Sequence, residues 1–414
     1  MITVKPFAAL RPKTEYVKEC AALPYDVMSS DEAREEVVGK PYSFLHIDKA
    51  EIDLDKSIDL YDEKVYAKAA ENLALFEEKG VYEQDKKKRF YFYRQVMDGR
   101  AQTGIVGCAS IDDYLENRIK KHELTRADKE QDRIRHVDTL SAQTGPIFLA
   151  YDHSEDLDEI IQTETIKTPV YDFVSDDGIQ HTVWASSSME VDEKIEKAFK
   201  ALNALYIADG HHRAASAVKA GLKRREAVPA YTGEEEFNFF LSVIFPAKSL
   251  KIFDYNRLLI GLNGLTETEF LQAVEDRLGK VTEYRGEGAC RPNETHTIGL
   301  YVGKKWYLVR FHDRVCCAEK PSERLDCAIL QNALLAPVLG IEDPRTSKRI
   351  DFVGGIRGLQ YLEKRCEEDA TAAIAMYPTS LEELMRVADA GEIMPPKSTW
   401  FEPKLRSGIF IHKI

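Results

Sequence analysis

The chain has 414 residues, 44% hydrophobic and 31% charged, with a formal net charge of −13. Its length predicts two or three domains, and its acidic balance argues against nucleic acid as a main partner, because phosphate backbones bind basic faces. Residues 1–7 lack an apolar signal core and no run of about 18 apolar residues occurs, so no membrane association is expected. Seven cysteines without a Cys-x-x-Cys pair fit reduced thiols and a cytoplasmic location.

The N-terminal part has the pattern of a small α+β unit. Apolar residues recur at helical spacing over residues 57–79, and Gly80 is a natural end for that helix. Residues 89–96 and 103–109 predict two strands. The Asp98-Gly99 pair between them predicts a hairpin turn.

A segment dense in charged residues follows over 114–136. Its first interpretation is a solvated helix or loop face. It contains His122-Glu123, which resembles the start of a zinc-protease helix. Arg126 stands where the second histidine of that motif would be, so we reject a zinc site.

The most informative stretch is a polar corner between two apolar segments. Residues 204–208 predict a short strand and residues 212–220 a helix that stops at Gly221. The corner between them consists of Asp209, Gly210, His211, His212 and Arg213.

This corner has the composition of a phosphate site. A helix start offers unpaired N–H groups and the positive end of the helix dipole. Two imidazoles and a guanidinium add donors suited to phosphate oxygens. Asp209 could hold a metal ion or a substrate hydroxyl. A plain Asp-Gly turn with solvated side chains is the alternative, and metal binding by the adjacent histidines is disfavoured because helix neighbours point to different faces.

The C-terminal half continues the mixed pattern. It predicts strands at 239–245 and 370–376, a hairpin over 297–311, and helices at 266–278, 325–339 and 378–390. A proline-stiffened segment, Pro395-Pro396-Lys397-Ser398-Thr399, follows the last helix. There is no Walker-type loop, no G-x-G-x-x-G and no G-x-S-x-G elbow. The fold class expected is an interleaved α+β protein.

Four segments together resemble the domain-of-unknown-function family 1015 (DUF1015). They are Pro-Tyr-Asp-Val at 24–27, His-Glu-x-Thr at 122–125, the Asp-Gly-His-His-Arg corner and Pro-Lys-Ser-Thr at 396–399. The last three, in the same order, are also similar to those of free serine kinases, whose fold resembles the ParB and sulfiredoxin proteins. That second resemblance covers roughly residues 115–414.

The resemblance implies a ParB/sulfiredoxin-like nucleotide and catalytic core at 113–250. An added α+β region precedes it at 1–112, and an α+β region at 251–414 contributes the Pro-Lys-Ser-Thr segment. The implied reaction moves a phosphoryl group between ATP or ADP and the hydroxyl of free L-serine, with Mg²⁺ as cofactor. Serine or phosphoserine and the nucleotide are then the partners.

The resemblance also implies roles for single residues. Glu123 would be the general base, with His122 orienting it. Gly210, His211, His212 and Arg213 would hold the nucleotide phosphates. Asp209 would position the hydroxyl or bind Mg²⁺. The substrate carboxylate or product phosphate would be bound by Lys397, Ser398 and Thr399. A ParB-type nucleotide switch without kinase activity and a phosphoserine hydrolase remain the alternatives.

Overall fold

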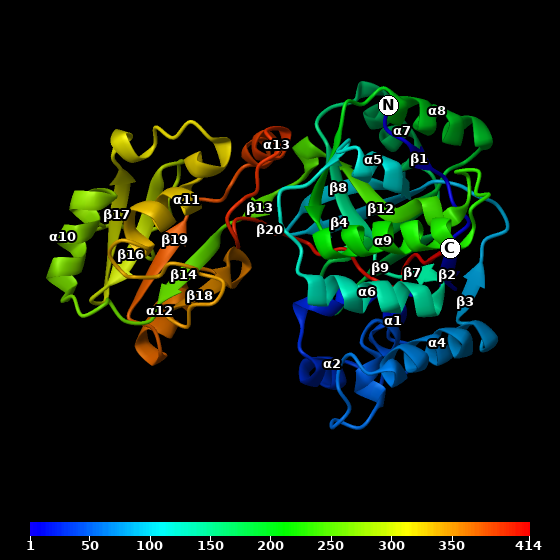
Figure 1. Ribbon diagram of the computed structural model, residues 1–414, viewed down its shortest axis with the longest axis horizontal. Helices are drawn as coiled ribbons and strands as arrows, with labels where there is room; N and C mark the ends of the chain where they lie inside the picture. The colour runs from blue at the N-terminus through cyan, green and yellow to red at the C-terminus, as the bar shows by residue number, and fades with distance from the viewer. The chain divides into compact units, whose positions relative to one another are not determined.

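The computed structural model describes residues 1–414, which form two compact units (Figure 1). Unit 1 contains Met1–Leu250 and Pro403–Ile414, and unit 2 contains Lys251–Glu402. The end of the chain therefore returns to unit 1 after passing through unit 2. Helices and sheets alternate along the sequence in both units, which confirms the predicted α+β class. None of the helices combines the length and the apolar character that a membrane span needs.

Unit 1 is built on a nine-stranded mixed sheet. Its order is β6-β11-β8-β12-β5-β4-β10-β9, with β1 beside β5. β6 runs parallel to β11 and β8 parallel to β12, whereas the other neighbours are antiparallel. The strands are β1 (Val4–Lys5), β4 (Tyr91–Met97), β5 (Arg100–Ser110), β6 (Ile119–Lys120), β8 (Ile147–Tyr151), β9 (Tyr171–Val174), β10 (Gln180–Ala185), β11 (Leu205–Asp209) and β12 (Phe239–Pro246).

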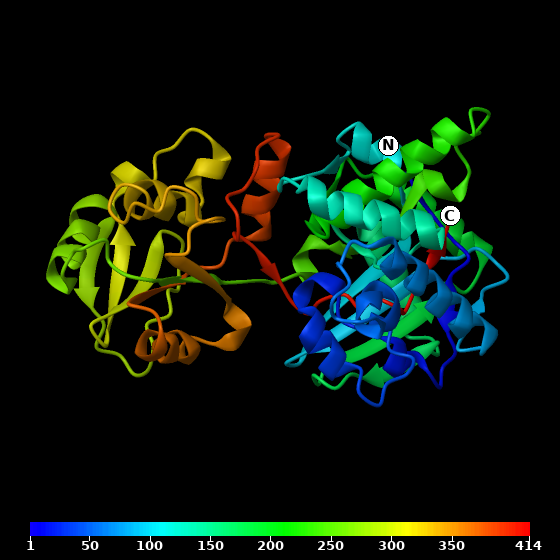
Figure 2. The same cartoon turned by 60° about the horizontal axis from the view of Figure 1, so that its bottom comes forward.

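Helices cover this sheet and bury its apolar side chains. Leu149 and Ile207 of the sheet share one buried cluster with Leu157 of α7, Phe199 of α8 and Val218 of α9. α6 and α9 lie side by side (Figures 1 and 2). The five helices of this part of unit 1 are α5 (Ile111–Leu115), α6 (Ala127–Leu140), α7 (Glu155–Glu164), α8 (Met189–Lys200) and α9 (His211–Ala227).

Helices α1 to α4 of unit 1 form a helical cluster with its own core. That core includes Ala33 of α2, Leu45 of α3 and Phe76 of α4. Two short ribbons, β2 with β3 and β7 with β21, attach the chain ends to this unit. These elements are β2 (Leu10–Pro12), α1 (Val17–Cys20), α2 (Ser30–Glu36), α3 (Leu45–Asp48), α4 (Glu63–Glu78), β3 (Tyr82–Gln84), β7 (Ala142–Gln143) and β21 (His412–Lys413).

Two predicted helix boundaries in unit 1 are wrong. The 57–79 helix begins only at Glu63, because Asp62 accepts a hydrogen bond from the Lys64 N–H and caps it. α9 does not stop at Gly221 but continues to Ala227. A Cβ at Gly221 would lie 2.4 Å from the carbonyl oxygen of Phe237, so this glycine permits close packing rather than ending the helix.

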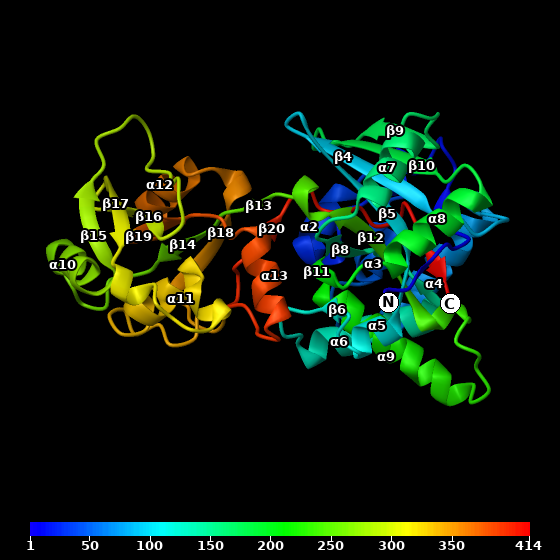
Figure 3. The ribbon, with the colours of Figure 1, turned by 90° about the horizontal axis from the view of Figure 1, so that it is seen from above.

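Unit 2 has a six-stranded antiparallel sheet in the order β15-β17-β16-β19-β14-β18. α11 and α12 lie on opposite faces of this sheet (Figure 3). A short ribbon joins β13 to β20. Its elements are β13 (Ile252–Phe253), β14 (Tyr255–Leu259), α10 (Glu267–Arg277), β15 (Gly279–Glu283), β16 (Thr297–Val302), β17 (Lys305–Phe311), α11 (Asp326–Leu330), β18 (Ile350–Gly354), α12 (Gln360–Glu368), β19 (Ala372–Met376), α13 (Leu381–Asp389) and β20 (Trp400–Phe401).

The prediction of one regular α-helix over 325–339 is also wrong. α11 ends at Leu330 and the chain continues as a π-helical turn at Gln331–Leu335. Such turns carry an extra residue in the helix and are frequent at functional sites. The hydrophobic period that predicted the helix does not distinguish the two forms.

Candidate functional site

Two parallel strands bring the corner and the His-Glu pair to the same edge of the unit 1 sheet. In the register, Leu205 of β11 faces Ile119 of β6. His122 and Glu123 follow β6, and Asp209 ends β11. Because parallel neighbours end at the same edge, side chains after both strands lie close together. The edge at the carboxyl ends of parallel strands is a common place for ligands.

Gly210 makes the turn from β11 into α9. Its φ is +90°, a left-handed conformation that favours glycine. A Cβ at this position would lie 3.0 Å from the guanidinium of Arg213, which packs over the turn. No side chain caps the start of α9. The first turn of this helix therefore presents N–H groups and a positive dipole end suited to an anion.

Asp209 is held by positive charge. Its Oδ2 lies 3.1 Å from Lys404 Nζ, and its Oδ1 accepts a 2.8 Å hydrogen bond from the Gly210 N–H. Burial alone would raise the pKa of Asp209, but Lys404, Arg213 and the Gly210 N–H together lower it well below the ordinary value. The carboxyl is therefore ionised, and Lys404 becomes part of the corner although it is distant in sequence.

His122 and His211 pack ring against ring beneath the corner. Their centroids are 4.4 Å apart and edge-to-face, and both residues are buried. Burial lowers the pKa of His122 to about 4, with Asp209 opposing. Burial, aided by His122, also lowers the pKa of His211 well below its ordinary value. Both imidazoles are consequently neutral at pH 7, and they act as hydrogen-bonding groups rather than as cations.

His212 faces the segment that leads into α6. Its Nε2 accepts a 3.0 Å hydrogen bond from the Arg126 N–H, so the proton of the neutral ring is on Nδ1. Burial also lowers the pKa of His212, while Asp26 and Glu130 oppose the shift. The predicted solvated face of 114–136 is wrong for α6, because Glu130 is buried and binds Lys219 and Thr125.

Glu123 is the most accessible acid at the corner. Its side chain is 56% exposed, and its Oε2 lies 3.6 Å from His211 Nδ1. A carboxylate that is both accessible and adjacent to a neutral imidazole can accept a proton from a bound hydroxyl. This geometry is compatible with the predicted base, whose role stays a prediction.

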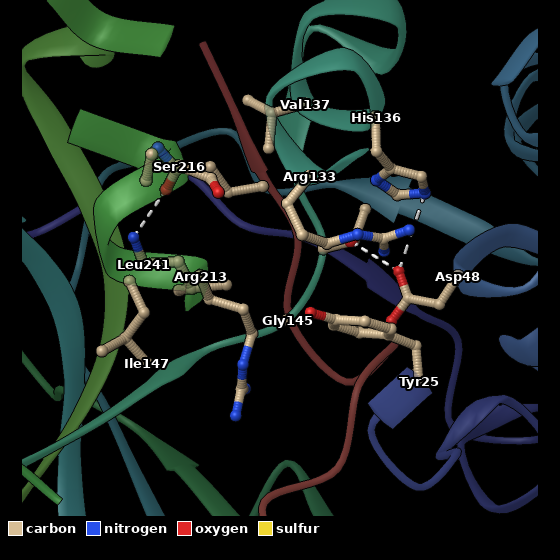
Figure 4. Close-up of a pocket in the computed structure, with 13 residues that line it drawn as sticks. Tyr25, Asp48, Arg133, His136, Val137, Gly145, Ile147, Arg213, Ser216 and Leu241 are labelled. Atoms are coloured by element: carbon tan, nitrogen blue, oxygen red, sulfur yellow. Dashed lines mark hydrogen bonds and ion pairs between the residues drawn. The ribbon is translucent and has the colours of Figure 1, made fainter. Parts of the chain in front are cut away.

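A small cavity of about 30 Å³ lies behind the corner (Figure 4). Arg213 lines one side of it, and Tyr25, Asp48, Arg133 and His136 line the other. The Arg133 guanidinium lies 4.0 Å from the centre of the Tyr25 ring and pairs with Asp132 at 2.9 Å. This volume suffices for about one or two water molecules. The cavity thus joins Arg213 of the corner to Tyr25 of the Pro-Tyr-Asp-Val segment, whereas Asp48, Arg133 and His136 belong to no motif that the sequence indicated.

The Lys397-Ser398-Thr399 segment belongs to unit 2. Lys397 has a φ of +59°, and its carbonyl accepts a 3.1 Å hydrogen bond from Arg257. The Ser398 hydroxyl is buried and bonds the Pro395 carbonyl. Thr399 is half-buried. The structure therefore gives Ser398 an internal role in the turn, and the predicted substrate contacts of the segment stay a prediction.

The family described as "Protein of unknown function (DUF1015)" matches residues 4–328. The chain belongs to the DUF1015 family. This match covers residues 4–250 of unit 1 and residues 251–328 of unit 2, but it does not include residues 396–399. No curated protein matches the chain.

Solved structures give distant similarities to this DUF1015 protein. A free serine kinase mutant in complex with AMP is 15% identical, covering 70% of this chain and 85% of that one, with a TM-score of 0.36. Another mutant in complex with ADP is 15% identical, covering 76% and 88%, with a TM-score of 0.35. SbnI from Staphylococcus aureus, truncated at its C-terminus, is 12% identical, covering 73% and 84%, with a TM-score of 0.38. Similarities at this level do not transfer a function.

A resident metal site does not fit the residues of the DUF1015 corner. No group of three or more His, Cys, Asp or Glu side chains is arranged to hold a metal ion. Asp209 offers one carboxylate, and Lys404 already binds it. Mg²⁺ is commonly held by one or two carboxylates together with substrate phosphates. Any Mg²⁺ would have to arrive with the nucleotide and compete with Lys404, and the predicted role of Asp209 as a ligand stays a prediction.

Proposed function

We propose that this DUF1015 protein transfers a phosphoryl group between a nucleotide and the hydroxyl of free L-serine, forming or consuming O-phospho-L-serine. One observation supports this most. The uncapped start of α9, flanked by the cations of Arg213 and Lys404, lies at the same sheet edge as the accessible carboxylate of Glu123. Phosphoryl transfer requires mainly positioning and charge stabilisation, which these groups can supply.

In the proposal, the phosphates bind at the start of α9. The backbone N–H groups of its first turn and the guanidinium of Arg213 donate to phosphate oxygens. The neutral ring of His212 can add its Nδ1–H, because its Nε2 is occupied by the Arg126 N–H. Lys404 offsets the negative charge that develops on the transferred group.

Glu123 then handles the proton. It accepts the proton of the serine hydroxyl while the hydroxyl oxygen attacks the terminal phosphorus, and the nucleotide departs with the bridging oxygen. The same carboxyl returns the proton in the reverse reaction, so ATP or ADP as donor and either direction are compatible with the site. The Pro-Lys-Ser-Thr segment of unit 2 is proposed to hold the carboxylate of serine, with the Lys397 ammonium as the charged group.

The test is an equilibrium assay of the full chain with L-serine, Mg²⁺ and either ATP or ADP. Phosphoserine should form, and phosphoserine with the partner nucleotide should regenerate the donor. Glu123→Gln should lower turnover by about 10²-fold or more, because it keeps the shape and removes the base. Glu155→Gln, at an exposed position of α7, is the matched control and should leave turnover unchanged.

Other outcomes assign the corner differently. Release of inorganic phosphate from phosphoserine without nucleotide would make the protein a hydrolase. Tight nucleotide binding without either product would make it a switch of the ParB type. Full activity of Glu123→Gln would transfer the role of base to another group.

A further inference from the structure

Arg257 occupies an unusual place in unit 2. It lies in the middle of β14, an interior strand of the antiparallel sheet, where its neighbours are Phe352 of β18 and Ile374 of β19. The residue is only 4% exposed. A guanidinium cannot shed its charge at any ordinary pH, so burying it is unfavourable unless an anion accompanies it.

No carboxylate accompanies Arg257. It forms no ion pair, and the acidic groups that act on it are the thiol of Cys327 and the phenol of Tyr255. Burial accordingly lowers the pKa of Arg257. Two of its N–H groups donate to the carbonyls of Tyr255 and Lys397. A guanidinium has five such donors, so three remain without a protein acceptor.

Arg257 lines a cavity of about 290 Å³ formed by residues of unit 2 alone. Cys327 and Phe352 also line it, and the π-helical turn contributes Gln331. Two carboxylates belong to the wall as well: Asp343 pairs with Arg345 at 2.8 Å, and Glu342 lies beside them. The side-chain oxygen of Gln331 is buried and has no donor. The cavity is close to the size of a small-molecule site. The guanidinium of Arg257 lies 5.4 Å from the centre of the Phe352 ring but has no ion-pair partner. The wall therefore combines a buried cation that lacks a paired anion with an unmatched hydrogen-bond acceptor.

We infer that this cavity binds a small organic anion, whose carboxylate or phosphate oxygens accept hydrogen bonds from Arg257. Bidentate recognition of planar or tetrahedral oxyanions is the interaction for which a guanidinium fork is best suited. A hydroxyl or amino group on the same molecule would supply a donor for Gln331. This inference does not depend on the reaction proposed for unit 1.

The bound anion would also fix the Pro-Lys-Ser-Thr segment. Arg257 donates to the Lys397 carbonyl, and Cys327 Sγ lies 3.2 Å from the Ser398 hydroxyl. Both contacts come from residues of the cavity wall. Occupation of the cavity therefore stabilises the conformation in which Lys397 has its positive φ.

Hydrogen exchange measured by mass spectrometry on the full chain tests this site, because it resolves peptides of each unit. Inorganic phosphate and lactate serve as the two probes and distinguish a phosphate ligand from a carboxylate ligand. At least one of them should protect peptides covering 255–258, 326–335 and 394–398. Arg257→Gln should raise the anion concentration needed for this protection about tenfold or more. Arg310→Gln removes an exposed cation of the same unit and should leave it unchanged.

Protection of peptides around 209–214 alone would assign anion binding to the corner of unit 1 and overturn the inference. Protection in unit 2 that survives Arg257→Gln would overturn it too. Either result leaves the phosphotransferase proposal standing, whereas an inactive protein with protected unit 2 peptides would reject only that proposal.

A second measurement uses the unaltered protein, so it tests the inference even where Arg257→Gln does not fold. Cys327 lines the cavity, whereas Cys317 is exposed. The ratio of the labelling rate with iodoacetate, an anion, to the rate with neutral iodoacetamide should therefore be higher at Cys327 than at Cys317. The probe that protects the unit 2 peptides should slow this labelling. Equal reagent ratios at both cysteines would show that the cavity does not recruit anions.

Discussion

Replacing His122 by glutamine should make unit 1 less sensitive to acid. His122 is 2% exposed, and burial lowers its pKa from 6.5 to about 4. Between these values the unfolded chain binds a proton that the folded chain does not, so this contribution to stability is complete above pH 6.5 and is lost as the pH falls. From about pH 7.5 to about pH 5, the two pKa values give a loss of about 2 kcal/mol from His122 alone.

The assay needs a signal from unit 1 only. Trp184 is the one tryptophan of this unit, so Trp306→Phe and Trp400→Phe leave its fluorescence as the reporter. Urea unfolding at both pH values then gives the pH dependence with and without His122→Gln. Glutamine keeps hydrogen-bonding capacity and does not titrate. The variant should lose about 2 kcal/mol less than the parent between the two pH values.

His153→Gln is the matched control, because His153 is exposed, and it should behave as the parent does. An unchanged pH dependence in His122→Gln would refute the claim that a neutral, buried His122 supports the corner.

The remaining predictions concern the same unit. Arg213→Lys should weaken nucleotide binding about tenfold in calorimetry, because an ammonium lacks the guanidinium fork; unchanged affinity would remove Arg213 from the phosphate site. Lys404→Met should lower the free energy of unfolding at neutral pH, because it removes the ion pair with Asp209. In urea titrations this loss should shrink below about pH 4, where Asp209 of the unfolded chain becomes protonated. Gly221→Ala should destabilise by about 1–2 kcal/mol, since the clash with the Phe237 carbonyl outweighs alanine's helix preference; a stabilised variant would contradict the packing argument.

Local chemistry made parts of the fold predictable. The hairpin turn at Asp98-Gly99 forms where the sequence predicts it, and both residues have positive φ. Gly391 ends the last helix of unit 2, also at positive φ, and Ser380 forms the capping box that starts it. In each case a few adjacent residues determine the backbone, so no knowledge of distant partners is needed.

The rest depends on contacts between distant residues. Nothing in the sequence shows that β6 pairs in parallel with β11, which is what brings Glu123 to His211. Lys404 was missed because its partner Asp209 lies almost two hundred residues away. The buried side chains of α6 were mistaken for a solvated face, because a charge run does not reveal which charges are paired. Arg257 left one signal that could have been used, a lone cation within the apolar strand 255–259.

Both units place a cation where the protein supplies no full complement of acceptors. Arg213 has a buried Nε without a partner, and Arg257 has three N–H groups without a protein acceptor. Neither forms an ion pair, although Asp and Glu outnumber Lys and Arg by 70 to 57 in the chain. In an acidic protein a carboxylate partner would be easy to provide, and many surface cations here have one. Arg213 is half-buried and its charge acts on Asp209, whereas Arg257 is buried with no carboxylate beside it. Burying Arg257 without an ion pair lowers the stability of the protein, which is the expected consequence of a site whose compensating charge comes from an anionic ligand.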